Sequence, residues 1–338
     1  MIEARLYEKL PESMVRCHTC QWRCRIAPDK TGVCKMYQNV SGVLYNMNYG
    51  RASSVAVDPV EKKPLFHLYP GSLCFSLGGW GCNFHCIHCQ NWEISCVNIP
   101  DAERGSYDVK PEKAIEMAKA EGCQGIAWTY NEPTVWFEYT LDSARLAREA
   151  GLYTAYVTNG YATPEALDML GPHLQAWRVD VKGFSDETYK KLARVTNWRG
   201  ILEVAGRARK KWNMHVEVVT NVTPTINDDD EQLKGIANWI ASELGELTPW
   251  HITRFYPQRD MLDFPATPME TMERALDIGK EAGLKFVYLG NVGPHTTANT
   301  VCYNCRNLIV RRDGYHIDVL GLSGSKCKFC GAELNFRV

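Results

Sequence analysis

Residues 79–91 read Gly79-Trp-Gly-Cys82-Asn-Phe-His-Cys86-Ile-His-Cys89-Gln-Asn91 and follow an apolar run, residues 72–77, that predicts a strand. The three cysteines of this stretch are separated by three and then two residues. Structural zinc sites are closed by four ligands, whereas a cubane iron–sulfur cluster held by three thiolates keeps one iron open to a substrate or cofactor. The alternative is a zinc site with His85 or His88 as fourth ligand, which would crowd adjacent ligands into one short loop.

The sequence that follows alternates short apolar runs with amphipathic stretches of helical length. This rhythm predicts parallel strands joined by right-handed crossovers, and hence an α/β fold whose sheet is open or curled into a full or partial barrel. The predicted strands are residues 72–77, 125–130, 152–157, 176–181, 214–222, 250–256 and 285–290. The predicted helices are residues 111–121, 136–150, a short helix that Pro164 opens behind a Thr163 cap, 199–211, 229–244 and 269–283.

Polar residues follow the predicted strands. In parallel α/β folds this carboxyl edge of the sheet carries the active site. The residues concerned are Gly78 to Cys89, Asn131 and Glu132, Thr158 and Asn159, Asp180 and Lys182, Thr220 and Asn221, and Arg254 with Tyr256. We expect the site among them.

Cysteines are unusually frequent, with 14 in 338 residues, and most fall into three short groups. Besides the central group there are an N-terminal quartet and a C-terminal quartet: Cys17, Cys20, Cys24, Cys34 and Cys302, Cys305, Cys327, Cys330. Without a signal peptide such groups more often bind metal than form disulfides. The paired Cys-x-x-Cys spacing of the C-terminal quartet is that of a zinc ribbon or rubredoxin-like site, for which we expect zinc. The N-terminal quartet suits either zinc or a second iron–sulfur cluster, with His18 as a substitute ligand.

Composition limits the classes of function. The 38 basic residues are balanced by 39 acidic ones, so no overall positive field attracts nucleic acid or an anionic membrane. A hydrophobic content of 45% allows a large core and excludes general disorder. The first ten residues contain no apolar signal segment, and no run of about 18 apolar residues occurs. We therefore expect a soluble cytoplasmic protein, with nucleic acid disfavoured as a partner.

Three parts are predicted along the chain: a cysteine-rich N-terminal segment, 1–70, an α/β core, 71–294, and a small metal-binding β module, 295–338. Neither flanking part is large enough to bury a core of its own. Both are therefore expected to depend on metal or on docking to the core.

The motif Cys82-x-x-x-Cys86-x-x-Cys89, after a strand and a glycine-rich turn, resembles the signature of the radical S-adenosylmethionine (radical SAM) superfamily. In particular the chain is similar to the pyruvate formate-lyase activating enzyme-like branch, and within it to the radical SAM proteins of the AmmeMemoRadiSam system. The strongest segments of the resemblance are Cys17 to Cys34, Asp58 to His67 and Gly81 to Trp92.

This resemblance implies a full or partial (βα) barrel and a [4Fe-4S] cluster on the three central cysteines. The open iron would chelate S-adenosylmethionine, and one electron from a donor such as ferredoxin or flavodoxin would release a 5′-deoxyadenosyl radical that abstracts hydrogen. The substrate would be a protein partner that gains a glycyl radical. Alternatives are radical modification of a small molecule or RNA, or a non-catalytic metal-binding or electron-transfer protein, which would leave the count of three cysteines unexplained.

The resemblance also implies which residues bind the cofactor. In place of the usual Gly-Gly-Glu after the second strand, this chain has Asn131-Glu132, in which Glu132 still offers an acid to the methionine ammonium group, while Lys182 is similar to a lysine beside the methionine carboxylate. The full expected set is His88, Asn131, Glu132, Thr158, Asn159, Asp180, Lys182 and Arg254. Simpler roles compete: Glu132 as a helix cap, Asn159 in an ordinary turn, and Lys182 at a solvated strand end.

Overall fold

The computed structural model of the chain describes residues 1–293 and 296–338, which form two compact units. The first unit comprises Met1–Asp58, Leu73–Trp177 and Asn197–Met214, and the second comprises Pro59–Ser72, Arg178–Thr196 and His215–Val338. The predicted boundary between core and C-terminal module, at 294 and 295, lies outside the described residues. Within the described chain, every helix is too short or too polar to cross a membrane.

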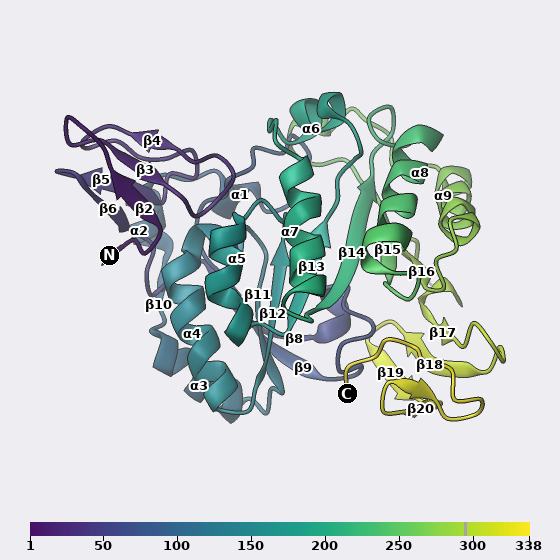
Figure 1. Cartoon of the computed structure of the whole chain (residues 1–338). Helices are drawn as coiled ribbons and strands as arrows, with labels where there is room; N and C mark the ends of the chain where they lie inside the picture. The colour runs from purple at the N-terminus through teal and green to yellow at the C-terminus, as the bar shows by residue number, and fades with distance from the viewer. Residues whose placement is uncertain (294–295) are drawn as a thin grey trace. The chain divides into compact units, whose positions relative to one another are not determined.

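The first unit is built on a strand order β12-β11-β9-β8 (Figure 1). These strands are β8 (Ser54–Pro59), β9 (Leu73–Gly78), β11 (Gly125–Trp128) and β12 (Tyr153–Thr158). β11 pairs in parallel with both β9 and β12. Helices α3 (Pro111–Ala120) and α4 (Phe137–Glu149) pack together, with α3 on β9 and α4 on β11 and β12. The buried apolar strands and the covering helices are those of a parallel α/β sheet.

Shorter elements complete the first unit. They are α1 (Trp92–Ser95), α2 (Ile99–Gly105), the 3₁₀ helix η2 (Pro133–Trp136), α5 (Pro164–Leu170) and α7 (Arg199–Lys210), with β7 (Arg51–Ala52) paired to β10 (Tyr107–Asp108). The N-terminal part forms two small antiparallel sheets, β1 (Ile2–Glu3), β6 (Val43–Asn46), β5 (Tyr37–Val40) and β2 (Tyr7–Lys9), β3 (Val15–Cys17), β4 (Arg25–Ile26). Their apolar residues share one core with Trp80 and Val135. The cysteine-rich segment of this unit is thus packed onto the segments that follow β9 and β11.

The second unit carries the strand order β16-β15-β14-β13. These strands are β13 (Ala176–Asp180), at whose residues the chain leaves the first unit, β14 (His215–Val222), β15 (Trp250–Arg254) and β16 (Val287–Gly290). β14, β15 and β16 pair in parallel. The helices are α6 (Asp186–Leu192), α8 (Asp230–Trp239) and α9 (Met269–Glu281), of which α9 packs on β15 and β16. The α/β class with a partial barrel-like parallel sheet, expected from the sequence, is confirmed.

The predicted elements agree closely with the observed ones. Thr163 caps α5 by accepting a hydrogen bond from the Ala166 N–H at 3.1 Å, and Asp229 caps α8 in the same manner. The helix predicted to run to residue 244 ends its α-helical part at Trp239 and continues as one π turn, Ile240–Leu244. The elements that were not predicted include β8, the short strands of the N-terminal part, α1, α2 and α6, which begins behind a Ser185 cap.

The C-terminal module is a pair of small antiparallel sheets. Its strands are β17 (Thr300–Val301), β18 (Leu308–Asp313), β19 (His316–Val319), β20 (Leu322–Ser323) and β21 (Lys326–Cys327). Its buried residues, among them Cys302 and Leu334, share a core with Phe286 and Tyr288 at β16. The module therefore uses apolar surface of the parallel sheet to complete its own core.

A buried carboxylate joins three parts of the second unit. Glu217 on β14 is fully buried and accepts hydrogen bonds from the backbone N–H groups of Phe66 (3.0 Å) and His67 (2.8 Å). It also accepts from Nε2 of His215 (2.8 Å) and of His251 (2.6 Å). Burial opposes its ionisation, but the bonds from the two imidazoles outweigh burial and hold the pKa of Glu217 well below its usual range. The charged form is thus the one that the fold stabilises.

His67 extends this network into the C-terminal module. Its Nδ1 lies 2.9 Å from the carbonyl oxygen of Leu334 and must donate there, so Nε2 accepts from the Tyr288 hydroxyl at 2.7 Å. Burial lowers the pKa of His67 well below its usual value, consistent with this neutral form. Arg312 of β18 stacks over the Phe66 ring and donates to the Phe66 carbonyl at 2.7 Å. Residues 66 and 67 are therefore the point at which the C-terminal module is attached to the rest of the second unit.

We expect Glu217→Gln to destabilise the folded protein by about 3–5 kcal/mol at neutral pH, because four donors then share an uncharged amide in a buried site. The measurement is urea denaturation followed by intrinsic fluorescence. Glu246→Gln is the matched control, since Glu246 forms an exposed pair with Lys285 and should change stability by less than about 0.5 kcal/mol. Equal stability of the two variants would contradict the anchoring role of Glu217.

Candidate active site

The register of the first unit brings the ends of three strands together. Trp128, the last residue of β11, pairs with Leu77 on β9 and with Tyr156 on β12. Because the pairing is parallel, the segments that leave these strands emerge at one edge of the sheet. Those segments carry the central cysteines, the Asn131-Glu132 pair and the Thr158-Asn159 pair, as the sequence predicted.

The loop after β9 holds the central cysteines in a largely buried environment. Cys86 is buried, and Cys82 and Cys89 are half-buried. The N–H of Phe84 donates to the Cys82 sulfur at 3.4 Å, and Nδ2 of Asn159 lies 3.8 Å from the same sulfur. Donors of this kind favour a thiolate and tune an attached iron–sulfur cluster.

The central cysteines fit a cluster better than a single ion. Burial raises the pKa of the Cys82 thiol well above its ordinary value, so a thiolate at this position needs a bound cation. Among the described residues, 1–293 and 296–338, the C-terminal quartet is the one group in which three or more potential metal-ligand atoms all lie within 4.8 Å of one another. The central thiols, and His85 and His88 beside them, are therefore not gathered around one point, which argues against the zinc alternative. His88 is itself buried in this loop.

Amide side chains fasten the cysteine loop to the residues after β11. Nδ2 of Asn131 donates to the Gly81 carbonyl at 2.6 Å, and Nδ2 of Asn91 donates to the Tyr130 carbonyl at 2.6 Å. Tyr130 adopts a left-handed backbone (φ 75°), an unfavourable conformation for a tyrosine that such contacts must maintain. Oδ1 of Asn131 is buried and has no hydrogen-bond partner among the residues that the structure describes. This acceptor suits a donor group of a bound cofactor, such as an ammonium.

Both carboxylate oxygens of Glu132 are bound by its neighbours. Its carboxylate accepts from the N–H of Thr134 at 2.9 Å, from the Thr158 hydroxyl at 2.8 Å and from the N–H of Asn159 at 2.7 Å. Glu132 thus caps η2 and binds the end of β12 to the end of β11. The carboxylate is buried, and burial raises its pKa. Its direct effect is to fix the position of Asn159, whose Nδ2 reaches Oδ1 of Asn83 at 2.8 Å.

The second unit holds the remaining expected residues. Asp180, at the end of β13, is bound by Nη1 of Arg178 at 2.5 Å and by Nζ of Lys182 at 3.0 Å. Arg254, at the end of β15, donates through Nε to the Thr267 carbonyl at 2.6 Å and stacks on Tyr256. Arg178, Asp180 and Lys182 therefore form one charged cluster, whereas Arg254 is anchored separately.

The C-terminal quartet is arranged for one metal ion. Its four sulfur atoms lie within 4.8 Å of one another, with 3.7 Å between Cys302 and Cys330 and between Cys305 and Cys327. Tetrahedral coordination at a metal–sulfur distance of about 2.3 Å requires edges of about 3.8 Å. N–H groups of Asn307 lower the pKa of Cys305 to about 6, which favours the thiolate form that a metal ligand requires.

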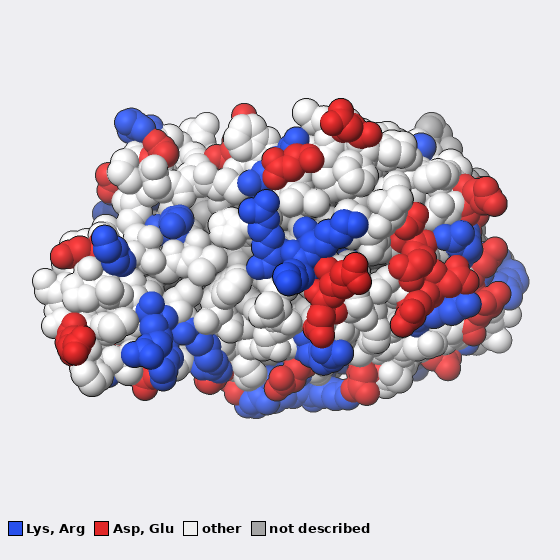
Figure 2. Space-filling model, turned by 90° about the horizontal axis from the view of Figure 1, so that it is seen from above, with Lys and Arg blue, Asp and Glu red and all other residues white. Residues whose placement is uncertain are grey.

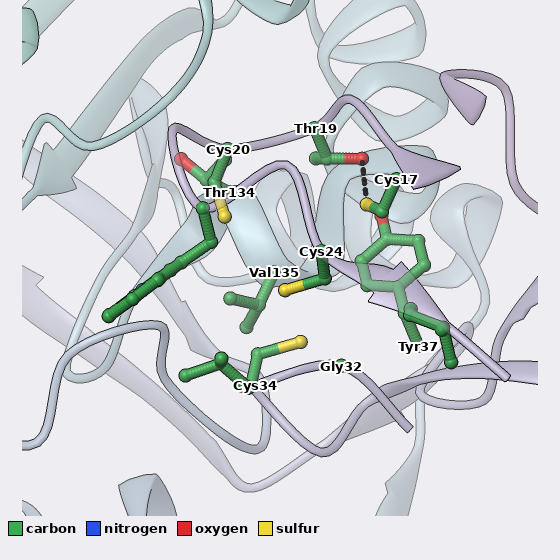
Figure 3. Close-up of a pocket in the computed structure, with 12 residues that line it drawn as sticks. Cys17, Thr19, Cys20, Cys24, Gly32, Cys34, Tyr37, Thr134 and Val135 are labelled. Carbon is green, nitrogen blue, oxygen red and sulfur yellow. Dashed lines mark hydrogen bonds between the residues drawn. The ribbon is translucent and has the colours of Figure 1, made fainter. Parts of the chain in front are cut away.

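The N-terminal quartet lines a pocket of its own in the first unit (Figure 3). Cys17 and Cys34 are buried, and Cys20 and Cys24 are half-buried. The other walls include Trp22 and Val135.

Several residues of the site were not singled out from the sequence. Asn83 and Asn91 stand in the cysteine stretch, and their amides link the strand ends as described. The sequence did offer one signal for these two residues. Each has an amide side chain within a loop that is expected to be buried, and the backbone carbonyl groups of a buried loop need hydrogen-bond donors. Trp22, whose indole N–H donates to the Asn83 carbonyl at 2.7 Å, carried no local signal because its partner is 61 residues away.

Comparison with known proteins identifies relatives over the whole chain. The profile of the radical SAM superfamily matches residues 79–240. "Uncharacterized protein MJ0808" of Methanocaldococcus jannaschii is 41% identical over 337 residues, 99% of each chain, and the pyruvate formate-lyase-activating enzyme of Clostridium pasteurianum is 24% identical over 57% of this chain and 82% of that enzyme. The structure of Streptococcus suis SuiB bound to S-adenosylmethionine covers 67% of this chain and 50% of that one at a TM-score of 0.50 and 10% identity, which shows likeness of fold.

We expect Cys327→Ser to release about one metal ion per chain, because a tetrahedral site that loses a thiolate loses most of its affinity. The loss should lower stability by at least about 2 kcal/mol, or roughly 4–8 °C in Tm. The measurements are elemental analysis and a thermal melt of the full chain. Cys96→Ser, at an exposed cysteine outside the three groups, is the control and should retain the metal. Unchanged metal content in Cys327→Ser would contradict a metal site at the C-terminal quartet.

Proposed function

The chain belongs to the radical SAM superfamily of enzymes, and from this premise we propose that it cleaves S-adenosylmethionine reductively to abstract a hydrogen atom from a protein partner. The observation that carries the proposal is the central cysteine loop. It presents three thiols in buried surroundings, and among the described residues no fourth ligand joins them at the spacing of a single ion. A cluster on three thiolates keeps one iron open, as the chemistry requires.

When bound, the four-iron cluster and S-adenosylmethionine supply a 5′-deoxyadenosyl radical after one-electron reduction. Cys82, Cys86 and Cys89 hold the cluster, and N–H donors such as Phe84 stabilise the charge on the thiolates. The largely buried loop excludes water from the reacting atoms.

The residues at the strand ends position S-adenosylmethionine. The vacant Oδ1 of Asn131 accepts a hydrogen bond from the cofactor, and Glu132 fixes Asn159 and the end of β12. Lys182, oriented by Asp180, supplies a positive charge for the methionine carboxylate. The remaining contacts in this proposal are His88, Thr158 and Arg254.

A protein is the substrate class that the relatives favour. The matched relative from Clostridium pasteurianum is a pyruvate formate-lyase-activating enzyme. By analogy, the hydrogen is removed from a glycine of the partner, and a ferredoxin or flavodoxin supplies the electron. Figure 2 shows a face of the protein on which acidic residues border the basic ones, and the 38 basic residues of the chain are balanced by 39 acidic ones, which disfavours an RNA substrate.

The C-terminal quartet takes zinc in this proposal. Four thiolates at tetrahedral spacing leave no open position for a substrate. The C-terminal module shares its apolar core with β16, so its metal serves only to hold the fold of the module. A redox-inert ion is sufficient for that role.

We expect anaerobically reconstituted protein, once reduced, to convert S-adenosylmethionine into equal amounts of 5′-deoxyadenosine and methionine. The triple variant Cys82→Ala, Cys86→Ala, Cys89→Ala should lose this activity and about four irons per chain, because the open iron is gone. Chromatographic product analysis and iron determination measure both. The control is again Cys96→Ser, which should behave as the wild type.

Absence of 5′-deoxyadenosine from iron-loaded, reduced wild-type protein would overturn the proposed cleavage. The partner class is tested with a candidate glycyl-radical protein in the same mixture, where electron paramagnetic resonance should reveal a carbon radical on that protein. The choice of a protein substrate would be overturned if no such protein gained a radical while a small molecule was modified in proportion to S-adenosylmethionine cleavage.

A further inference from the structure

The N-terminal quartet forms a second thiol-lined pocket that the proposed radical chemistry does not use. Cys17 lies on β3, Cys20 and Cys24 follow on the turn to β4, and Cys34 precedes β5. Figure 3 shows the thiols of Cys20, Cys24 and Cys34 pointing toward one space. Apolar side chains make up much of the remaining wall: Trp22, Ile26, Val33 and Val135.

The lining of this pocket is unusually rich in thiols. All four cysteines of the N-terminal quartet border it, and the thiol of Cys17 lies 3.5 Å from the Thr19 hydroxyl (Figure 3). Packing alone does not require four cysteines around one space, since other small apolar residues would fill it as well. Four thiols around one space are instead a ligand set for a metal centre.

The spacing of the quartet argues against one ion. In the described part of the chain, the four sulfur atoms of the C-terminal quartet lie within 4.8 Å of one another, whereas no three sulfur atoms of the N-terminal quartet come that close together. A single tetrahedral ion needs sulfur–sulfur edges of about 3.8 Å. Thiols that surround a pocket at larger separations match ligands of different irons in one polynuclear cluster.

The N-terminal quartet also lies directly against the central cysteine loop, and both belong to the first unit. The indole N–H of Trp22, a wall of the pocket, donates to the carbonyl of Asn83 at 2.7 Å. Gly81, with φ 77°, approaches Cys34 so closely that a Cβ on it would lie 2.6 Å from the Cys34 carbonyl oxygen. The residue before Cys82 thus contacts the backbone of a member of the quartet.

We propose that the N-terminal quartet holds a second iron–sulfur cluster, of the four-iron type, in electron-transfer contact with the cluster of the central loop. A one-electron donor of the ferredoxin or flavodoxin class reduces the second cluster by one electron, which then passes to the first cluster and restores the second to its oxidised state. No bond is made or broken in this transfer. The metal assignment stands by itself, whereas the direction of electron flow rests on the proposed function.

The test removes the three ligands of the central cluster and leaves the N-terminal quartet unchanged. The triple variant Cys82→Ala, Cys86→Ala, Cys89→Ala should keep about four irons with matching sulfide, and its reduced form should give an electron paramagnetic resonance signal. The double variant Cys20→Ala, Cys24→Ala should keep about four irons at the central loop, and the wild type about eight. Cys96→Ser should match the wild type in both measurements.

The spectrum of the fully reduced wild type tests the contact between clusters. Two reduced clusters in contact should couple magnetically, so that the wild-type signal is broader than the sum of the two variant signals. A wild-type spectrum equal to that sum would overturn the electron-transfer contact.

An iron-free triple variant with about two zinc ions per chain would overturn the second cluster and make the N-terminal quartet a structural zinc site. These outcomes are independent of catalysis. A triple variant that holds iron, together with a wild type that does not cleave S-adenosylmethionine, would reject the proposed function and leave the second cluster in place.

Discussion

The parallel register of β9, β11 and β12 is the constraint on which the site depends. It aligns Leu77, Trp128 and Tyr156, so that the segments after these strands emerge side by side. The carboxylate of Glu132 then joins the ends of β11 and β12, and Asn131 joins the end of β11 to the cysteine loop. A shift of one residue would turn every strand-end side chain to the opposite face and separate these partners. The chemistry of the central cysteines is thus a consequence of strand pairing.

Burial explains why the central cysteines need a bound metal cluster. A buried thiol is a weak acid, and the burial that raises the pKa of Cys82 makes its thiolate unfavourable without a positive partner. The same reasoning applies at the N-terminal quartet, where burial raises the pKa of Cys17 to about 12 and that of Cys34 to about 11. In the C-terminal quartet, in contrast, the N–H groups of Asn307 lower the pKa of Cys305 and so favour its thiolate. The three cysteine groups therefore differ in charge balance as well as in spacing.

The sequence predicted the parallel core well because its signals are local. Apolar runs, the Thr163 cap and the acids before α8 each act within a few residues, and the observed elements begin and end close to the predicted positions. The short N-terminal strands and α6 have too few residues to show a period. The roles of Glu217, His67 and Trp22 could not be predicted, since their partners are distant in the chain. Glu132 shows the same limit: its acid type suggested a ligand, while its full set of protein donors becomes visible only in three dimensions.

The central claim is that an iron held by Cys82, Cys86 and Cys89 binds S-adenosylmethionine directly. Electron–nuclear double resonance on the reduced double variant Cys20→Ala, Cys24→Ala, with S-adenosylmethionine labelled with ¹⁵N in its amino group and ¹⁷O in its carboxylate, tests this claim most directly. The account predicts hyperfine coupling of both labels to the cluster, because both groups would be ligands of the open iron. A cluster signal without coupling to either label would contradict it.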